Sequence, residues 1–569
     1  MRIKRSLAAP AAVVLAALAT GGWLLQQSGS QDKNVYVQAR LFDEVLHEVT
    51  DHFVEAKQPA QLYRMAIDGM LQEMGDPHTV FMDAKEYENL RVQTQGEYGG
   101  LGIQILKTNG VITVVAPLPG TPAEKAGVQA GDQIVEVNGE STKGWSEDQA
   151  VAKLRGPKGS VVDVKMQRSG VPAPIPFRIT REEIHVRSVP AAYMLSNHVG
   201  YVDLSVFSEG STDEMRQALD SLRAAGMKGV VLDLRYNPGG LLDQGVGVAE
   251  LFLKRGQAVS ETRSRVAGQS SSYRAEANDR YPGMPIVVLV NPYTASASEI
   301  LAGALQDHDR ALVLGQTSYG KGSVQTLYPL QGGNWLKMTT ARWFTPSGRS
   351  IQKPYGIGRD TIQAADGRRF APNDSADAQD GEGPDSSAAA STKAGKPVYQ
   401  TDSGRKVYGG GGIVPDVFVS PDTLSTAERT FIQSLQQYGS RYFDTRFQYA
   451  VDYAREHPAL PRDFTVTPDM LGAFYGVLQQ RGVKVSRPAF DAGAGWVARD
   501  LALWIARDKW GEQARFQRIN AEDSAVKTAV DLLQRSPTPQ ALMGNGERFA
   551  AAHPAPRDTR TAANDDDRN

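Results

Sequence analysis

The segment Ile286–Asn291, IVVLVN, constrains the fold of this chain most strongly. It is a short run of branched apolar residues bounded by Pro285 and Pro292, a pattern that predicts a buried strand. The apolar residues of the following stretch, Ile300–Leu305, recur at helical spacing. The sequence therefore predicts a buried strand followed, after a short turn, by a helix.

Ser296 occupies the predicted start of this helix. Together with Glu299, three residues later, it fits a capping box. Backbone N–H groups in the first turn of a helix have no partner within the helix, so the amide of Ala297 can face a developing oxyanion. The plain alternative is that Ser296 only caps the helix.

Lys321 follows the small polar turn Gly315–Gly320 and precedes a strand-like run, SVQTLYPL. A lysine at the start of a core strand can be desolvated, which lowers its pKa and lets the neutral amine act as a base. Gln325 falls on the same face of such a strand and can hold the Lys321 amine by a hydrogen bond. The alternative is a lysine that extends from a strand end into solvent.

Two further strand-like runs, VGYVDLSVF and GVVLDLR, flank residues 213–225, whose apolar residues have helical spacing. The strand, helix, strand order predicts an α/β layer. The turn Asn237–Gly240 follows the second strand, and its two glycines allow the backbone to approach a substrate closely.

Residues 96–183 form a separate module. It contains a Gly100-Leu101-Gly102-Ile103 loop, a helix start at Thr121, an Asn-Gly hairpin signal and a second helix start at Ser146. This order resembles a PDZ domain. The resemblance implies that Gly100, Leu101, Gly102 and Ile103 present free amides to the terminal carboxylate of a peptide, which adds as a strand beside the second helix.

Four motifs in order resemble the carboxy-terminal processing proteases, also called tail-specific proteases: TASASEI, SYGKGSVQ, TPSGRSIQ and VYGGGGIVPDV. The separation of 25 residues between Ser296 and Lys321 is also similar to that of the family. The resemblance implies an α/β protease core of the ClpP/crotonase-like class with an inserted PDZ domain and helical segments at both ends.

The same resemblance assigns roles to individual residues. Ser296 is the nucleophile, Lys321 the general base and Gln325 its orienting residue, with Ser298 as the rival nucleophile. The amide of Ala297 and that of either Gly239 or Gly240 form the oxyanion hole. Arg155, at the end of the second PDZ helix, resembles an arginine that couples peptide binding to assembly of the active site; its alternative is a solvated surface charge.

Composition excludes several classes of function. The chain has no cysteine, which rules out a thiol protease, disulfides and thiolate metal sites. Its eight histidines form no pair at metal-binding spacing, and its net charge of −2 gives no broad attraction to nucleic acid. We therefore expect no metal, no cofactor and no nucleic-acid partner.

The domain organisation follows from local patterns. Residues 1–27 combine an early cluster of basic residues with an apolar run, which predicts an export signal or an uncleaved membrane anchor and hence a body outside the cytoplasm. The family resemblance implies that this compartment is the bacterial periplasm, with anchoring to the inner membrane as the alternative to release. The other predicted segments are a helical region at 28–95, the PDZ domain at 96–183, the core at 184–420 with a disordered insertion at about 361–397, a helical domain at 421–545 and a disordered tail at 546–569.

We therefore expect an exported serine endopeptidase that captures the free C-terminus of a protein and cleaves the chain upstream of it. The expected partners are protein substrates with exposed C-termini, with an adaptor protein and a homo-oligomer as further expectations. The alternative is a non-catalytic PDZ scaffold that binds protein C-termini without cleaving them.

Overall fold

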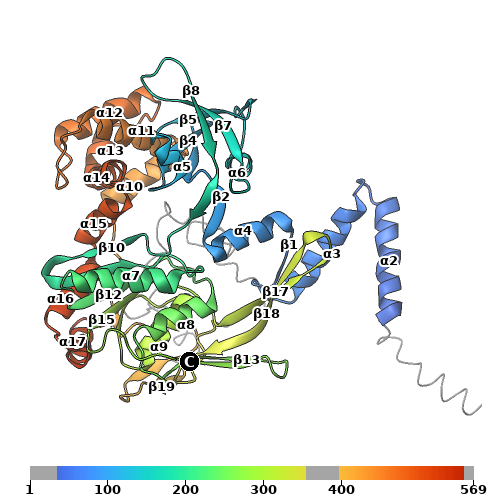
Figure 1. The fold of residues 1–569 in the computed structure, drawn as a ribbon, viewed down its shortest axis with the longest axis vertical. Helices are drawn as coiled ribbons and strands as arrows, with labels where there is room; N and C mark the ends of the chain where they lie inside the picture. The colour runs from blue at the N-terminus through green and yellow to red at the C-terminus, as the bar shows by residue number, and fades with distance from the viewer. Residues whose placement is uncertain (1–34, 354–395, 556–569) are drawn as a thin grey trace, which may run out of the picture. The chain divides into compact units, whose positions relative to one another are not determined.

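The computed structural model describes residues 35–353 and 396–555 (Figure 1). The chain divides into two compact units, Met1–Phe81 and Met82–Asn569. The predicted signal or anchor at 1–27, most of the predicted insertion at 361–397 and the last part of the predicted tail lie outside the described residues.

The first unit contains two amphipathic helices, α2 (Val35–His52) and α3 (Pro59–Glu73). Helix α2 buries no residue, and Leu41 and Val45 on its apolar stripe are each more than half exposed. Among the described residues, no helix combines the length and apolar character that a membrane span requires.

Short elements lead from the first unit into the PDZ module, and a two-stranded ribbon connects that module to the core. Strand β1 (Val80–Met82) and helix α4 (Ala84–Gln95) come first. Strand β2 (Glu97–Gly100) then pairs antiparallel with β9 (Glu182–His185). Because the chain enters and leaves the module through this ribbon, the module is an insertion.

The PDZ module is an antiparallel sheet in the order β3-β4-β5-β7-β8, with β6 paired to β5 and two short helices. Its core is one cluster that includes Leu101, Val114 and Leu154. The elements are β3 (Ile103–Thr108), β4 (Val111–Pro117), α5 (Pro122–Lys125), β5 (Gln133–Val137), β6 (Glu140–Ser141), α6 (Glu147–Leu154), β7 (Val161–Gln167) and β8 (Ile175–Thr180).

The core of the protein is a six-stranded sheet in the order β10-β11-β12-β15-β16-β21. Strand β10 is antiparallel to β11, and the other neighbours are parallel. The strands are β10 (Ala191–Met194), β11 (Val199–Asp203), β12 (Gly229–Asp233), β15 (Ile286–Val290), β16 (Leu312–Gly315) and β21 (Val417–Phe418).

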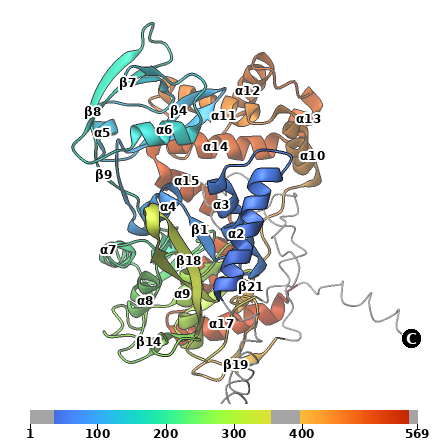
Figure 2. The same ribbon diagram turned by 90° about the vertical axis from the view of Figure 1, so that its right-hand side faces the viewer.

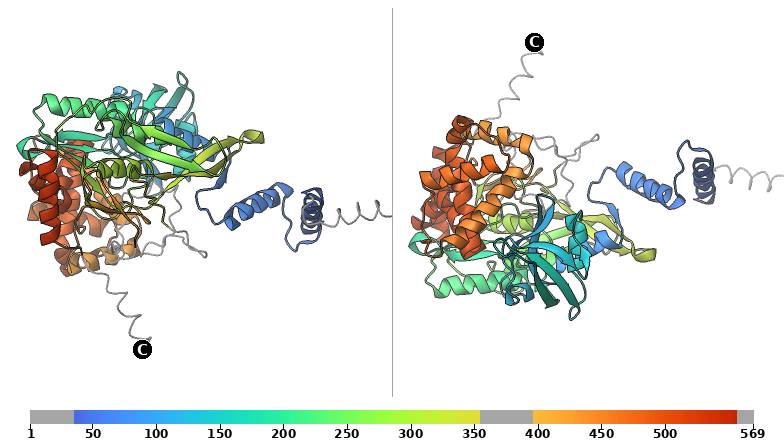
Figure 3. Two further views of the ribbon diagram at one scale, coloured as in Figure 1. Left: turned by 90° about the horizontal axis from the view of Figure 1, so that it is seen from below. Right: turned by 90° about the horizontal axis from the view of Figure 1, so that it is seen from above.

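Helices cover both faces of this sheet, which explains why its central strands are apolar throughout. Helices α7 (Ser211–Ala224), α8 (Leu242–Glu250) and α9 (Ala297–Asp307) connect successive parallel strands and pack on one face. Helices α16 (Ser524–Gln534) and α17 (Pro539–Ala552) cover the other face (Figure 3). Within β15, Val288 packs toward the first set of helices, whereas Val287 packs toward the second.

A second, antiparallel sheet extends from the core. Strand β18 (Trp335–Phe344) pairs with β17 (Ser323–Pro329) and with β13 (Ala258–Ser264), which also pairs with β14 (Ser271–Arg274). The hairpin of β17 and β18 begins two residues after Lys321. A small ribbon is formed by β19 (Val398–Gln400) and β20 (Lys406–Tyr408).

The remaining helices form a separate apolar core at the C-terminal end of the chain. They are α10 (Thr426–Leu435), α11 (Arg441–Glu456), α12 (Pro468–Gln480), α13 (Arg487–Ala492), α14 (Ala494–Trp510) and α15 (Glu512–Glu522). They lie beside the PDZ module (Figure 2), where Phe447 and Val451 pack against Val115.

The predicted tail begins too early. Residues 546–552 belong to α17 rather than to a disordered segment. The reason is burial: Met543 is in the core, and Gly546 lies so close to Leu312 of the sheet that a side chain would not fit there.

Candidate active site

Three loops meet at the carboxyl edge of the parallel sheet, where ligand sites of α/β proteins form. They follow β12, β15 and β16, and they carry the Asn237–Gly240 turn, Ser296 and Lys321 respectively. The strand and the helix predicted on either side of Ser296 are β15 and α9.

Ser296 is the N-cap residue of α9 and has a strained backbone, with φ 55° and ψ −117°. The predicted capping box of Ser296 and Glu299 is present. In it, the Glu299 carboxylate accepts the Ser296 N–H at 2.8 Å, and the Glu299 N–H also donates to the backbone oxygen of Ser296. The Ser296 hydroxyl forms no hydrogen bond with any residue that the structure describes, so the sharp turn presents it without using it as a cap.

Glu299 connects the serine turn to the lysine turn. Its side chain is fully buried, and one carboxylate oxygen accepts the N–H groups of both Ser296 and Lys321, at 2.8 and 2.9 Å. The other oxygen accepts the Gly320 N–H at 2.7 Å and the Ser318 hydroxyl at 2.5 Å. Burial raises the pKa of Glu299 to about 7, against the four hydrogen bonds that lower it.

The sequence predicts Glu299 only as a capping residue. The capping box gave its bond to Ser296, but nothing in the local sequence indicates the three donors at 318–321, which lie 19 to 22 residues further on.

Lys321 and its neighbours are fixed by backbone bonds on both sides. Trp343 Nε1–H donates to the Lys321 carbonyl oxygen at 3.0 Å, and the Gly322 N–H donates to the side chain of Gln352 at 3.0 Å. The Gln325 amide nitrogen donates to the hydroxyls of Ser323 and Thr339, at 2.9 and 3.2 Å. Its carboxamide oxygen is therefore the atom through which Gln325 can accept a hydrogen bond from an amine.

The two glycines after Asn237 differ in the state of their amides. The Gly239 N–H donates to the Asn237 side chain at 2.9 Å. The Gly240 N–H donates to no group in the described part of the chain, and neither does that of Ala297 at the first position of α9. A Cβ added at Gly239 would lie 2.7 Å from Ser296 Cβ and 2.9 Å from the Ala297 nitrogen, so the two turns are in close contact.

Ser298, the rival nucleophile, is fully buried, and its hydroxyl donates to the Asn237 carbonyl oxygen at 3.1 Å. That hydroxyl therefore holds the glycine turn against α9 and is not presented at the surface, which leaves Ser296 as the candidate nucleophile.

The two remaining sequence motifs support this edge of the sheet. Arg349 of TPSGRSIQ is fully buried and pairs with Asp307 at the end of α9, at 2.7 Å. In the glycine-rich motif, the Gly410 N–H donates to Ser350, and the Ile413 N–H donates to the Ser318 hydroxyl at 2.6 Å. These motifs therefore pack behind the lysine turn.

The loop Gly100–Ile103 of the PDZ module holds backbone N–H groups that make no hydrogen bond within the described residues. Leu101 is buried, and its carbonyl oxygen accepts the Ala123 N–H at 3.0 Å. Gly102 has φ 74°, and an added Cβ would lie 2.3 Å from the side chain of Thr121. The N–H groups of Leu101 and Gly102 donate to no described residue. Gly100 belongs to β2, and Ile103 begins β3.

Arg155 lies at the C-terminal end of α6 and is not a free surface charge. Its guanidinium carbon lies 4.4 Å from the ring centre of Tyr98, which belongs to the β2–β9 ribbon between the PDZ module and the core. The next residue also joins the ribbon, because the Gly156 N–H donates to the Gly99 carbonyl oxygen of β2 at 3.1 Å.

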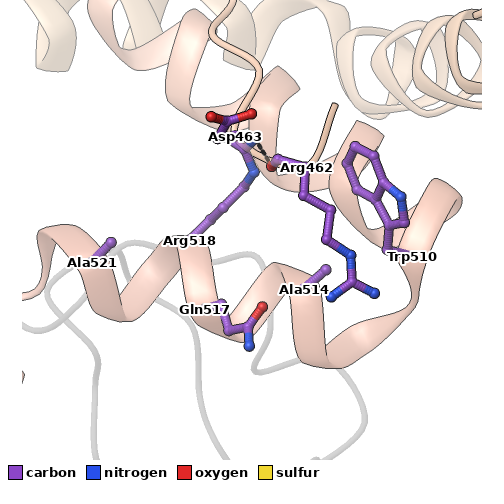
Figure 4. A pocket seen from close by; sticks show the side chains of 7 residues that line it. All are labelled: Arg462, Asp463, Trp510, Ala514, Gln517, Arg518 and Ala521. Carbon is purple, nitrogen blue, oxygen red and sulfur yellow. Dashed lines mark hydrogen bonds between the residues drawn. The ribbon is translucent and has the colours of Figure 1, made fainter. Parts of the chain in front are cut away.

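A separate pocket lies among the C-terminal helices (Figure 4). It has a volume of about 220 Å³ and includes Arg462, Trp510 and Arg518 in its lining, but no residue of the three loops at the sheet edge. No cluster of three or more histidine or acidic side chains within the described ranges is arranged to hold a metal ion.

Comparison with known proteins agrees with this architecture. Residues 198–362 match Peptidase family S41, residues 113–168 match a PDZ domain, and residues 23–86 match the N-terminal domain of the activating protease CtpB. The fold and the domain set define a serine-type peptidase that carries a PDZ domain.

Two relatives of this chain specify the family within this class of peptidases. The carboxy-terminal-processing protease of Bartonella bacilliformis is 41% identical over 333 residues, which are 58% of this chain and 75% of that protein. The carboxy-terminal processing protease CtpA of Bacillus subtilis is 39% identical over 288 residues, 51% of this chain and 61% of that protein. The chain belongs to the carboxy-terminal processing protease family.

Solved structures similar to this chain include a photosystem II D1 C-terminal processing protease, at 35% identity and a TM-score of 0.31, covering 55% of this chain and 84% of that one. Another is the PDZ domain of a carboxy-terminal protease from Vibrio cholerae in complex with a peptide, at 27% identity and a TM-score of 0.15, covering 16% of this chain and 98% of that one.

Proposed function

We propose that this protease binds the C-terminal tail of a protein substrate in its PDZ module and cleaves the chain with a Ser296/Lys321 dyad. The observation that carries the proposal is the Glu299 carboxylate, one oxygen of which binds the backbone of both residues. A serine and a lysine held by one buried atom are suited to act as nucleophile and base.

The proposed reaction proceeds through an acyl-enzyme. The neutral Lys321 amine takes the proton of the Ser296 hydroxyl as the serine oxygen bonds to the peptide carbonyl carbon. The resulting oxyanion accepts the N–H groups of Ala297 and Gly240. When the C–N bond breaks, the leaving amine takes the proton from Lys321. Water then attacks the ester with Lys321 as base, which releases the carboxylate and restores Ser296.

Two features support these assignments. Gly240 is the preferred glycine because the Gly239 amide is already bonded to Asn237. Gln325 is proposed to orient Lys321 through its carboxamide oxygen, since its nitrogen is bonded to Ser323 and Thr339. Tail binding is assigned to the amides of the Gly100–Ile103 loop, and Arg155 is proposed to transmit occupancy of the groove to the β2–β9 ribbon.

The test uses purified Ser296→Ala and Lys321→Ala proteins with an unfolded substrate that ends in an apolar tail. Each variant is expected to lose at least about 10³-fold in kcat, because each removes a group that the covalent step requires. Both variants should bind a fluorescent tail peptide as the wild type does. Retained cleavage by Ser296→Ala would contradict the nucleophile assignment, and absence of cleavage by the wild type would favour the non-catalytic scaffold.

We further propose that the protein acts in the periplasm, either released after cleavage of its N-terminal segment or anchored to the inner membrane by it. The basic and apolar pattern of residues 1–27 supports export. The exposed apolar residues of α2 support a homo-oligomer, and an adaptor protein is a further proposed partner. Fractionation of cells that express the tagged chain tests the location, and cytoplasmic recovery would contradict it.

A further inference from the structure

Arg235 joins the glycine turn of the active site to the C-terminal helices. It lies two residues after the end of β12 and one residue before the Tyr236–Gly240 turn. Its Nε and Nη2 donate to Asp233 at 2.9 and 2.7 Å, while Nη1 donates to Asp523 at 2.7 Å. The Arg235 and Asp523 side chains are only 17% and 15% exposed, so the pair is shielded from solvent.

Asp523 comes from the corner between α15 and α16, 288 residues further along the chain. Its second carboxylate oxygen caps α16 by accepting the Val526 N–H at 2.9 Å. One turn earlier, the buried Asn520 donates to the hydroxyl of Tyr193 in β10, at 2.6 Å. The corner is therefore fixed to the sheet and can serve as an anchor for Arg235.

The turn that follows Arg235 needs such an anchor. Tyr236 has φ 63°, a left-handed conformation that an aromatic residue rarely adopts, and its side chain is 60% exposed. Its ring stacks on that of Tyr293, with ring centres 5.4 Å apart, and is not buried in a core. A strained conformation persists only where neighbouring groups fix it. Asn291 accepts the Tyr236 N–H at 3.1 Å, and Asn237 fixes the centre of the turn through the Leu204 carbonyl oxygen. Arg235 holds the end of the turn that adjoins β12.

We propose that Asp523 is a positioning residue for the peptidase site. Acting through Arg235, it holds the Tyr236–Gly240 turn in the conformation that directs the Gly240 amide at the tetrahedral intermediate. Asp523 itself does not touch the substrate. This inference rests on the proposed function, and it gives the C-terminal helices a part in catalysis that is distinct from tail binding.

The variant Asp523→Asn tests this role. Asparagine is as good an N-cap residue as aspartate, so α16 keeps its cap when the amide oxygen faces Val526. The amide NH₂ then faces the Arg235 guanidinium, donor against donor, and the charged bond is lost. Removing one oxyanion donor costs about 10²–10³ in kcat, and displacing one should cost less, about 10-fold.

The expected signature separates transition-state binding from substrate binding. In Asp523→Asn, kcat and the affinity for a peptide boronate, which forms a tetrahedral adduct with the serine, should fall by the same factor. KM and the affinity of the PDZ module for a tail peptide should not change. A merely structural role would lower thermal stability without this matched loss, and wild-type boronate affinity in a folded variant would overturn the proposal.

The matched control is Asp500→Asn. Asp500 also pairs with a buried arginine of the C-terminal helices, Arg446, at 3.0 Å, but Arg446 makes no contact with the glycine turn. Loss of the Asp500–Arg446 ion pair should change the thermal stability and leave the boronate affinity as in the wild type. If Asp523→Asn does not fold, Asp523→Ser keeps a capping oxygen and is expected to give the same kinetic loss.

Ser296→Ala, measured in the same assay, separates the two hypotheses. An inactive Ser296→Ala protein together with a fully active Asp523→Asn protein would reject the positioning role while leaving the dyad intact. An active Ser296→Ala protein would reject the dyad itself.

Discussion

At the scale of single residues, Glu299 is the side chain that connects the serine turn to the lysine turn. A buried carboxylate is costly unless it is hydrogen-bonded, and this one accepts four donors from two loops. Three of them are backbone N–H groups, which cannot reverse their role when the carboxyl group gains a proton. Ionised Glu299 fits this site fully, whereas protonated Glu299 does not.

The variant Glu299→Gln is therefore expected to lose about 100-fold in kcat. Its side-chain NH₂ is a donor and would point at backbone N–H groups, which are donors that the carboxylate accepts in the wild type. Since the pKa of Glu299 is raised to about 7, the wild-type carboxyl is protonated below that pH and ionised above it. The ratio of wild-type to variant kcat should thus rise with pH through about 7 and then level off. Taking the ratio removes the titration of other groups, and a ratio that does not vary with pH would contradict this role.

Stability should change with pH in the opposite direction. The folded-state pKa of Glu299 lies above its ordinary value of 4.5, so this group favours folding most at low pH. That contribution is lost as the pH rises through about 7. A loss of activity on acidification therefore cannot be explained by unfolding caused by Glu299. Thermal melts of the wild type and of Glu299→Gln between pH 4.5 and about 7 distinguish a loss of activity from a loss of stability.

At the scale of elements, a hydrogen bond ties the edge strand β3 of the PDZ module to helix α6. The Lys107 N–H of β3 donates to the carboxylate of Glu147, the first residue of α6, at 2.5 Å. A peptide that adds as a strand between β3 and α6 pairs with the free edge of β3. Glu147 therefore competes with the tail for one backbone donor.

Replacing this carboxylate should strengthen tail binding. An exposed hydrogen bond of this kind contributes about 0.5–1 kcal/mol, so Glu147→Ala is expected to lower the Kd of a fluorescent tail peptide about 3-fold. The control is Asp148→Ala, which removes the same charge from the same helix end but has its partner in Lys85 of α4. Equal effects of the two substitutions, measured by anisotropy, would indicate general electrostatics and contradict the competition.

Local sequence predicted those elements whose causes are local. The strand at Ile286–Val290, helix α9 and the reciprocal capping box of Ser146 and Gln149 all form. The capping box at Ser296 is also present, although the Ser296 hydroxyl itself makes no cap hydrogen bond.

Contacts between distant segments could not be predicted in the same way. The bond from Arg235 to Asp523 spans 288 residues, and the three further donors to Glu299 lie in another loop. An apolar stripe likewise predicts only that one face of a helix favours burial, and the stripe of α2 is exposed. The spacing of apolar residues predicts which face of a helix favours burial, but it does not predict which other element covers that face.

At the scale of the second unit, Met82–Asn569, the PDZ module is held by the C-terminal helices as well as by its own ribbon. Phe447 of α11 is buried against Val115 of β4 and lies edge-on to Trp504, with ring centres 6.2 Å apart. Two polar contacts flank this cluster: Arg507 to Gln104 at 2.8 Å, and the Asn109 N–H to the Asp444 carboxylate at 3.2 Å. Both reach β3 or its end, so the strand proposed to pair with the tail is also the strand that the helices fix.

Loosening this contact should separate tail-dependent from tail-independent cleavage. The variant Phe447→Ala removes a buried aromatic ring, which costs about 3–5 kcal/mol locally and frees β4 from the helices. A bound tail raises the concentration of its own chain near Ser296 only while the PDZ module keeps its orientation. We expect kcat/KM for a tailed substrate to fall about 10-fold, with no change for a short peptide that lacks the tail.

The control for size is Phe443→Ala in the same helix, because Phe443 packs on the core of the C-terminal helices and not on the PDZ module. Its effect on the two substrates should be equal. Hydrogen exchange should rise in β4 only in the Phe447 variant. Equal losses on tailed and untailed substrates in Phe447→Ala would mean that the helices support the catalytic edge alone. Delivery of the tail would then depend on the β2–β9 ribbon, where Arg155 lies against Tyr98.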